Sequence, residues 1–317
     1  MGTGWNRTLR IWNNDTRLEV ACLSHNSQVI AIAWLDGDAG VMALSEDGVL
    51  GKWTRLRPNE WEWGRLLNVG PEKHAPEDMV CLAYARDRIA VAFPRSGVKV
   101  WMWYKGSWLA QRSIMRTNVT ALKFIDSGDA LLGGTREGAV WHCAVPNGTM
   151  RVYAFLQSSI TSIDINPTGT HALIAQKGGS ACLVSLGSHD EKRVRTSYLD
   201  ADLQDGALGG VFAAKGTTVV FGAVEESLLV WDTQRAAIVY GMQHEDGEIS
   251  CLSSLISPSC NGAKGCVITG TRQGQLTWWP QPPEQGTCAT HFRGVFSVDV
   301  LVVQSPPSAS RKRAKVR

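Results

Sequence analysis

The side chains that could perform chemistry are spread along the chain and form no recognisable cluster. None of the seven histidines lies at metal-ligand spacing with another. Cys260 and Cys266 are the one close pair among eight cysteines, but no histidine or second pair stands at zinc-site spacing. A G-x-S-x-G elbow, a phosphate-cradling glycine loop and an H-E-x-x-H helix are all absent from the sequence. We therefore expect no catalytic residue, no bound metal and no cofactor.

One repeated sequence pattern predicts the strands and turns that must position any functional residue. It is a polar tight turn containing Gly, followed by an apolar strand that ends on Trp, as in Glu46-Asp47-Gly48 before Trp53. Its anchors are spaced 40 to 48 residues apart, and one of them is Leu in place of Trp. They are Trp12, Trp53, Trp101, Trp141, Leu183, Trp231 and Trp278. This period is typical of a four-stranded propeller blade and is too long for a leucine-rich or helical-hairpin repeat.

Short β-branched runs bounded by Gly, Asp, Asn or Ser accompany the anchors, which is the pattern of strands joined by tight turns. No long window shows a sustained helical stripe. Each repeat predicts an inner strand, a second strand, the Gly turn, the Trp strand and an outer strand. Because such sheets have two apolar faces, they must stack on their neighbours and close into a ring. We predict an all-β, seven-bladed propeller over residues 1–304, followed by a flexible Pro/Ser linker and basic tail over 305–317.

These features resemble the WD-repeat propeller family over nearly the whole chain. The family's Trp-Asp pair is present once, at Trp231-Asp232, and its Gly-His pair is reduced to Ser24-His25 and Gln243-His244. The resemblance implies a structural hydrogen bond for His25 and His244. It also implies that the chain is a protein-interaction scaffold and not an enzyme.

The two ends of the chain are expected to share one blade. Residues 8–12 supply a Trp strand, residues 17–23 an outer strand, and residues 295–303 an inner strand. The second strand of this composite blade is missing from the pattern, so the blade could be incomplete. Residues 1–6 could add a short stub, the blade could have three strands, or the chain could begin inside a longer propeller.

Acidic side chains gather in loops that share one face of the predicted ring. Such a rim would favour a basic peptide segment, although loops are also acidic simply because they are solvated. The candidate partner-binding acids are Glu72, Glu77, Asp78, Asp200, Asp202, Asp205, Glu245, Asp246 and Glu248.

Two tryptophans on one outer strand form a second candidate surface. Trp61 and Trp63 alternate with Glu60 and Glu62, so both indoles lie on one side of the strand. Exposed, they would mark a contact patch, because aromatic side chains carry much of the energy of interfaces. Packing against the neighbouring blade explains the pattern equally well.

The last seven residues include five cations, at Arg311, Lys312, Arg313, Lys315 and Arg317. Subtracting these five from the formal net charge of +3 leaves a slightly acidic body. Basic runs of this kind are typical of nuclear import signals. This predicts a protein of the nucleus, or of the nucleus and cytoplasm, that binds an import receptor. A solvated terminus without a specific role is the alternative. Direct nucleic-acid contact is disfavoured, because no aromatic side chains interleave the charges. No signal peptide or apolar membrane span is visible, so secretion is not expected.

The function that agrees best with these features is a non-catalytic scaffold inside a multiprotein complex. One alternative is a reader of basic or methylated peptide tails at the propeller mouth. A second is a truncated or decaying propeller copy, and a third is a propeller enzyme. Ser45-Glu46-Asp47-Gly48 resembles the start of the sialidase Ser-x-Asp-x-Gly box but lacks the residue between Asp and Gly, so an ordinary blade turn explains it better.

Overall fold

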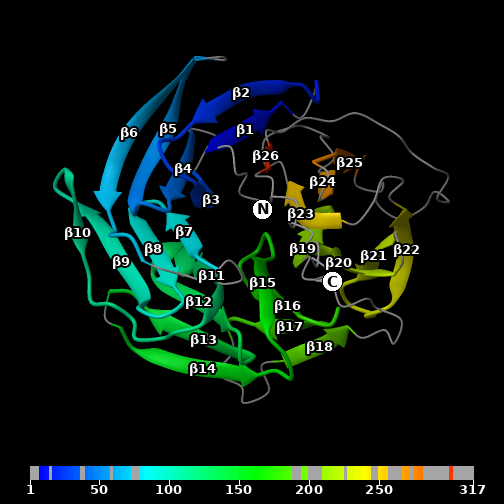
Figure 1. Ribbon diagram of the computed structural model, residues 1–317. Helices are drawn as coiled ribbons and strands as arrows, with labels where there is room; N and C mark the ends of the chain where they lie inside the picture. Colours follow the sequence, from blue (N-terminus) through cyan, green and yellow to red (C-terminus); the bar gives the residue numbers. More distant parts are fainter. Residues whose placement is uncertain are drawn as a thin grey trace, which may run out of the picture.

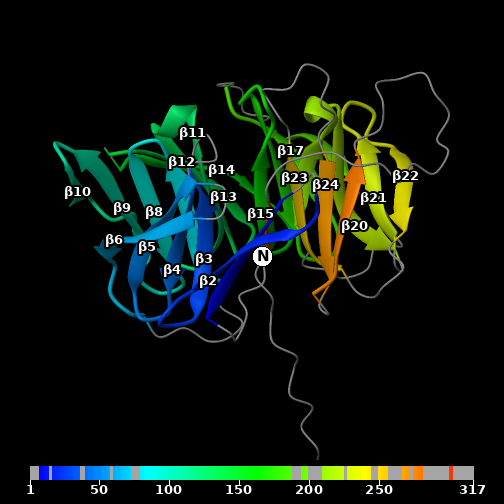
Figure 2. The same cartoon turned by 90° about the horizontal axis from the view of Figure 1, so that it is seen from above.

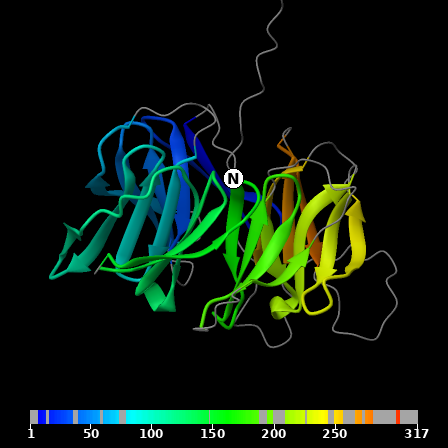
Figure 3. The ribbon, with the colours of Figure 1, turned by 90° about the horizontal axis from the view of Figure 1, so that it is seen from below.

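The chain folds into a ring of antiparallel sheets around a central axis (Figure 1). The computed structural model describes residues 7–13, 16–35, 40–57, 60–72, 79–146, 148–187, 194–198, 209–224, 227–243, 249–255, 266–271, 274–280 and 300–302. In each sheet built from consecutive strands, the strand nearest the axis comes first in the sequence and the outermost strand comes last, and in the side views the strands run across the thickness of the ring (Figures 1, 2 and 3). The prediction of an all-β propeller is confirmed.

Six sheets are each built from consecutive strands. The first has β3 (Val29–Trp34), β4 (Gly40–Ser45), β5 (Val49–Arg57) and β6 (Glu60–Asn68). The second has β7 (Cys81–Ala85), β8 (Arg88–Phe93), β9 (Gly97–Tyr104) and β10 (Ser107–Ala110). The third has β11 (Val119–Ile125), β12 (Ala130–Thr135), β13 (Ala139–Ala144) and β14 (Met150–Phe155). The fourth has β15 (Ile160–Ile165), β16 (His171–Gln176), β17 (Ala181–Ser185) and β18 (Val194–Tyr198). The fifth has β19 (Gly210–Ala213), β20 (Thr218–Val224), β21 (Ser227–Asp232) and β22 (Ile238–Gln243). The sixth has β23 (Ile249–Leu255), β24 (Cys266–Thr271) and β25 (Leu276–Pro280). Two single-turn 3-10 helices, η2 (Asp126–Gly128) and η3 (Ala214–Gly216), precede β12 and β20.

The two ends of the chain form one further sheet, and it corrects the predicted number of blades. β1 (Thr8–Trp12) pairs with β2 (Glu19–Ser24) on one side and with β26 (Val300–Val302) on the other. The expectation of seven blades is therefore wrong: the described residues form six blades of consecutive strands and a three-stranded sheet in which β26 is three residues long. Counting Trp anchors overstates the blades because Trp12 lies on β1, whose partners among the described residues are β2 and the short β26 and not a second strand of its own repeat. The predicted boundary at residue 304 lies outside the described residues.

The Gly turns are fixed by contact with the connection that follows the outer strand of the same blade. Gly138 has a φ of +82°, and a Cβ there would lie 2.3 Å from the carbonyl oxygen of Leu156. The amide of Leu156 donates to the Gly138 carbonyl oxygen at 2.8 Å. Only Gly accommodates both the left-handed backbone and this close approach. The turn between the second and third strands is therefore held against the segment through which the chain leaves the blade.

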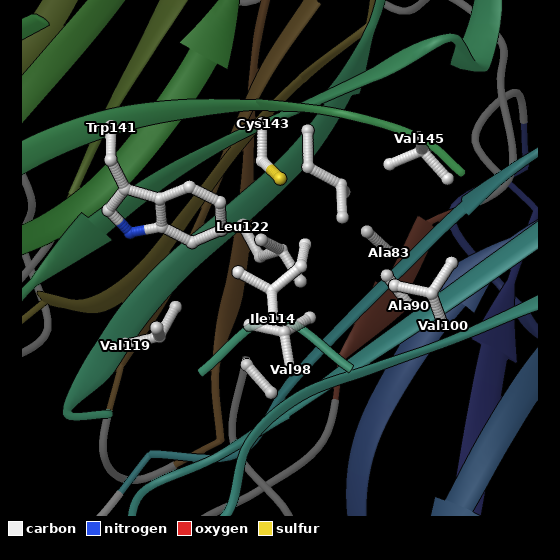
Figure 4. Packing of buried hydrophobic residues seen from close by; sticks show 12 residues of the cluster. Ala83, Ala90, Val98, Val100, Ile114, Val119, Leu122, Trp141, Cys143 and Val145 are labelled. Atoms are coloured by element: carbon white, nitrogen blue, oxygen red, sulfur yellow. The ribbon is translucent and has the colours of Figure 1, made fainter. Parts of the chain in front are cut away.

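The hydrophobic core lies in the seams between neighbouring blades. One cluster joins Val98 and Val100 of β9 to Trp141 and Cys143 of β13, in the next blade (Figure 4). Trp141 is fully buried there. Its ring covers Gly133 of β12 so closely that a Cβ on Gly133 would lie 2.1 Å from Trp141 Cζ2. Trp141 is thus a packing residue that fills its seam above a small residue on the adjacent strand.

This arrangement predicts that Gly133→Ala destabilises the protein by about 1–3 kcal/mol, because the added methyl group overpacks a filled seam. Urea denaturation followed by tryptophan fluorescence measures the effect. Gly64→Ala is the matched control, because Gly64 lies on a strand and a Cβ there meets nothing within 4 Å. Equal stability of the two variants would show that the contact between Trp141 and Gly133 does not limit packing.

Candidate functional site

Side chains of the inner strands bind the backbone of the neighbouring blade. Ser162 Oγ accepts a hydrogen bond from the Gly210 amide at 2.7 Å, and Asp164 Oδ2 accepts one from the Phe212 amide at 2.8 Å. In the preceding seam, Thr120 Oγ1 donates to the Ile160 carbonyl oxygen at 2.6 Å. These bonds satisfy backbone groups that no sheet pairing reaches. They hold blades together around the axis, and their role is structural.

Asp164 is the ionisable member of this set. Burial raises the pKa of its carboxyl group, while the Lys123 charge and the backbone donors Phe212 and Ile165 act in the opposite direction. The Asp164 carboxylate accepts a hydrogen bond from the Phe212 amide and thereby links β15 to β19. It is therefore not positioned as a free acid or base.

A second structural contact involves His25, directly after β2. His25 Nε2 accepts a hydrogen bond from Trp53 Nε1 at 3.0 Å. The imidazole also makes edge contacts with the rings of Trp53 and Trp63, at centroid distances of 5.7 and 4.9 Å. The predicted structural hydrogen bond of His25 is confirmed, whereas His244 lies outside the described residues. Because Nε2 is the acceptor, we assign the proton of the neutral ring to Nδ1.

Burial lowers the pKa of His25 to about 4, and the nearby Asp47 charge opposes that shift. The unfolded chain therefore takes up a proton near pH 6.5, whereas the folded ring stays neutral until about pH 4. His25 thus causes the free energy of unfolding to fall as the pH drops from about 6.5 to about 4. The full shift corresponds to about 3 kcal/mol, and solvent screening of the partly exposed ring reduces the expected loss to about 1–2 kcal/mol.

Urea denaturation of the wild type and of His25→Gln at pH 7.5 and pH 5 tests this assignment. The glutamine keeps an acceptor for Trp53 Nε1 but cannot titrate, so the loss of stability at pH 5 should be smaller in the variant. His171→Gln is the control, because His171 is also half-buried but lies in another blade. An unchanged pH dependence in His25→Gln would contradict the assignment.

Trp61 and Trp63 of β6 lie in the seam next to the end sheet. Both are half-buried and pack on a cluster that includes Leu9, Ile11 and Leu23. The Trp63 ring is 5.2 Å from the Trp53 ring, centroid to centroid. This placement agrees with the packing interpretation of the pair. A binding role for their remaining exposed edges stays a prediction.

Glu72 is the one member of the predicted acidic rim within the described residues. Its carboxylate accepts hydrogen bonds from the Ser96 hydroxyl and from the amides of Arg95 and Ser96, at 3.2 Å for Ser96 and 3.4 Å for Arg95. Glu72 thus caps the Gly turn of the next blade. The other proposed acids, Glu77, Asp78, Asp200, Asp202, Asp205, Glu245, Asp246 and Glu248, lie outside the described residues. So do the tail cations Arg311, Lys312, Arg313, Lys315 and Arg317.

The described residues contain no group of three or more His, Cys, Asp or Glu side chains that could hold a metal ion. Six cysteines lie in the described part of the chain, and all six are free thiols. Cys260 and Cys288 lie outside it. No helix within the described residues is long and apolar enough to span a membrane.

Exposed apolar side chains gather on the outer strands of two neighbouring blades. The exposed fraction is 44% for Trp103 and 53% for Tyr104 on β9, 44% for Leu109 on β10, and 40%, 42% and 74% for Met150, Val152 and Phe155 on β14. The second and third blades, which carry these strands, are neighbours in the ring (Figure 1). We call the exposed residues of β9, β10 and β14 the apolar rim, and it is the candidate binding surface of the described structure.

The apolar rim was not predicted from the sequence. Tyr104, Leu109, Met150 and Val152 lie on strands where apolar residues are expected, and nothing in the repeat distinguishes an exposed position from a buried one. Of the twelve tryptophans in the described residues, Trp103 is the most exposed, at 44%, and it lies on β9, away from the axis. Trp34 alone lies on an innermost strand, where it is half-buried. The described tryptophans therefore form no aromatic cage at the centre of the ring.

No protein-family model matches the chain, and no curated protein matches it in sequence. Among solved structures, it is similar to the Myceliophteria thermophila Cps50 (Swd1) β-propeller domain. The similarity covers 88% of this chain and 92% of that chain, with a TM-score of 0.66 and 13% sequence identity. At this identity the match establishes a shared fold, which agrees with the ring of sheets. The protein is thus a β-propeller.

Proposed function

We propose that the protein is a non-catalytic scaffold of the WD-repeat type that binds other proteins through its apolar rim. The observation that carries this proposal is the exposure of Trp103 and Tyr104 on β9, Leu109 on β10 and Phe155 on β14, in two adjacent blades. Packing of the ring does not require apolar side chains there, and contiguous exposed apolar surface is typical of protein contacts. The similarity to a solved propeller supports the fold on which this surface is built, but function must be argued from the surface itself.

Affinity purification of the full chain tests the proposal. We expect partner proteins to be recovered in stoichiometric amounts, and recovery to fall at least about tenfold when Trp103 and Phe155 are both changed to Ser, since aromatic anchors dominate interface energy. Val239→Ser is the control, because Val239 is 56% exposed on β22 of another blade. Thermal melting must first show that all variants fold. Partner recovery that is unaffected by the rim variant would overturn the proposal, as would the absence of any partner.

We also propose that the tail at 311–317 directs the protein to the nucleus through an import receptor. Five cations within seven residues support this proposal. A tandem fluorescent-protein fusion, made too large to diffuse passively, should concentrate in the nucleus. Replacing Lys312, Arg313 and Lys315 with Ala should abolish that accumulation, and the charge-retaining replacements Lys312→Arg, Arg313→Lys and Lys315→Arg should preserve most of it. Equal distributions for the two triple variants would reject an import role.

A further inference from the structure

Four residues of the apolar rim line opposite sides of one seam. Trp108 packs toward the first blade and pairs with Trp103, so both rings lie on that face of the β9–β10 hairpin. Side chains alternate along a strand, which places Tyr104 of β9 on the opposite face. Leu109 pairs with Met102 on that same opposite face. This is also the face from which Val98 and Val100 pack against the third blade.

The third blade presents matching positions from its own outer strand. Met150 pairs with Cys143, and Val152 pairs with Trp141. Cys143 and Trp141 are buried against the second blade, so Met150 and Val152 lie on the face that points toward it. We call Tyr104, Leu109, Met150 and Val152 the outer seam. Gln111 and Arg112 of the second blade lie close to Ala144, Pro146 and Gly148 of the third.

The strands around the outer seam are free of acidic residues. From Arg88 to Ile125 the chain has seven lysines and arginines and no Asp or Glu, and from Gly138 to Ile163 it has Arg151 and no Asp or Glu. The described acids of these two blades lie in the turns at strand ends, where Asp129 pairs with Arg88 and Glu137 accepts a hydrogen bond from Asn118. The local charge is therefore positive, although the body of the protein is slightly acidic.

Two exposed cations stand beside the outer seam. Lys105, at the tip of the β9–β10 hairpin, lies over the Tyr104 ring at 5.2 Å from its centroid. Arg112 follows β10 and lies along Gly148 of the third blade, where a Cβ would be 3.8 Å from Arg112 Cδ. Neither cation forms an ion pair with an acid of the described residues. Their charges are thus available to a partner.

We propose that the outer seam binds an acidic segment of another protein in which leucine or phenylalanine side chains stand between the carboxylates. The apolar side chains would contact Leu109 and Val152 across the seam, and the carboxylates would pair with Lys105 and Arg112. Charge complementarity selects this occupant, because a basic segment would meet like charges that carry no neighbouring acid. The proposal rests on the scaffold function above and names its partner's chemistry.

Three fluorescently labelled peptides of equal length test this pairing against the full chain by fluorescence anisotropy. The first alternates Asp with Leu and Phe, the second has Lys in place of Asp, and the third has Ser in place of Leu and Phe. The first should bind at least about tenfold more tightly than the other two, because each of those lacks one of the two complementary features. Its affinity should fall as NaCl rises from about 50 to 300 mM. Equal binding of the Asp and Lys peptides, or no binding of the first, would overturn the proposal.

Variants locate the contact on the surface. Lys105→Glu combined with Arg112→Glu should weaken the first peptide at least about tenfold, and so should Leu109→Ser combined with Val152→Ser. The matched controls are Arg235→Glu and Val239→Ser, which change an exposed cation and an exposed apolar residue of the fifth blade. These should leave the affinity within about twofold of the wild type, a change of about 0.4 kcal/mol. Equal weakening by the control and seam variants would contradict binding at the seam.

The outcome also separates this proposal from the scaffold function. Partners that co-purify normally with the seam variants, but are lost when Trp103 and Phe155 are changed, would reject the outer seam and retain the scaffold. Loss of partners with the Lys105/Arg112 variant, which leaves the apolar side chains in place, supports the acidic segment. The absence of partners for the wild type would reject the scaffold itself, whatever the peptides do.

Discussion

The structure depends on the need of every blade to cover both of its apolar faces. A four-stranded sheet with a leucine-, valine- and alanine-rich face on each side is not stable in water, because burial of apolar area is the main favourable contribution to folding. Each blade satisfies this need only by contact with two neighbours, as Val100 and Trp141 do across one seam. Stability is therefore distributed over the seams. The recurrent Trp contributes to several of these seams, and Trp101, Trp141 and Trp231 are buried in them.

Hydrogen bonds between neighbouring blades add to the packing of the seams. The inner strands of neighbouring blades belong to different sheets, so the backbone groups on their free edges need other hydrogen-bond partners. Ser162 and Asp164 meet two such groups on β19, and Thr120 meets one on β15. Farther from the axis, His25 accepts a hydrogen bond from the indole N–H of Trp53. Polar residues on these strands are thus explained by the closure of the ring and do not by themselves indicate chemistry.

The local period of the sequence was enough to predict strands, Gly turns and buried tryptophans, because each depends on contacts within one repeat or with the next. Gly138 and Trp141 are examples: the left-handed turn and the large indole each have a residue type that identifies them. The number of blades was not predictable in this way. Trp12 carries the anchor residue, but only long-range pairing shows that β1 joins the three-residue β26. Glu72 shows the same limit for the site, because its hydrogen bonds to Ser96 join a loop to a turn 24 residues away.

On the outer strands, packing between blades constrains the residue type less than it does near the axis. The composition of these strands therefore carries information about function. Near the axis adjacent blades touch, so a buried apolar residue on β11 or β12 follows from packing alone. Toward the rim the blades diverge (Figure 1), and side chains such as Leu109 and Val152 remain open to solvent while still facing the neighbouring blade. Packing would tolerate polar residues at these positions. The chain nevertheless has apolar residues at these positions, on strands that contain no carboxylate. Closure of the ring does not explain this composition, whereas a binding surface does.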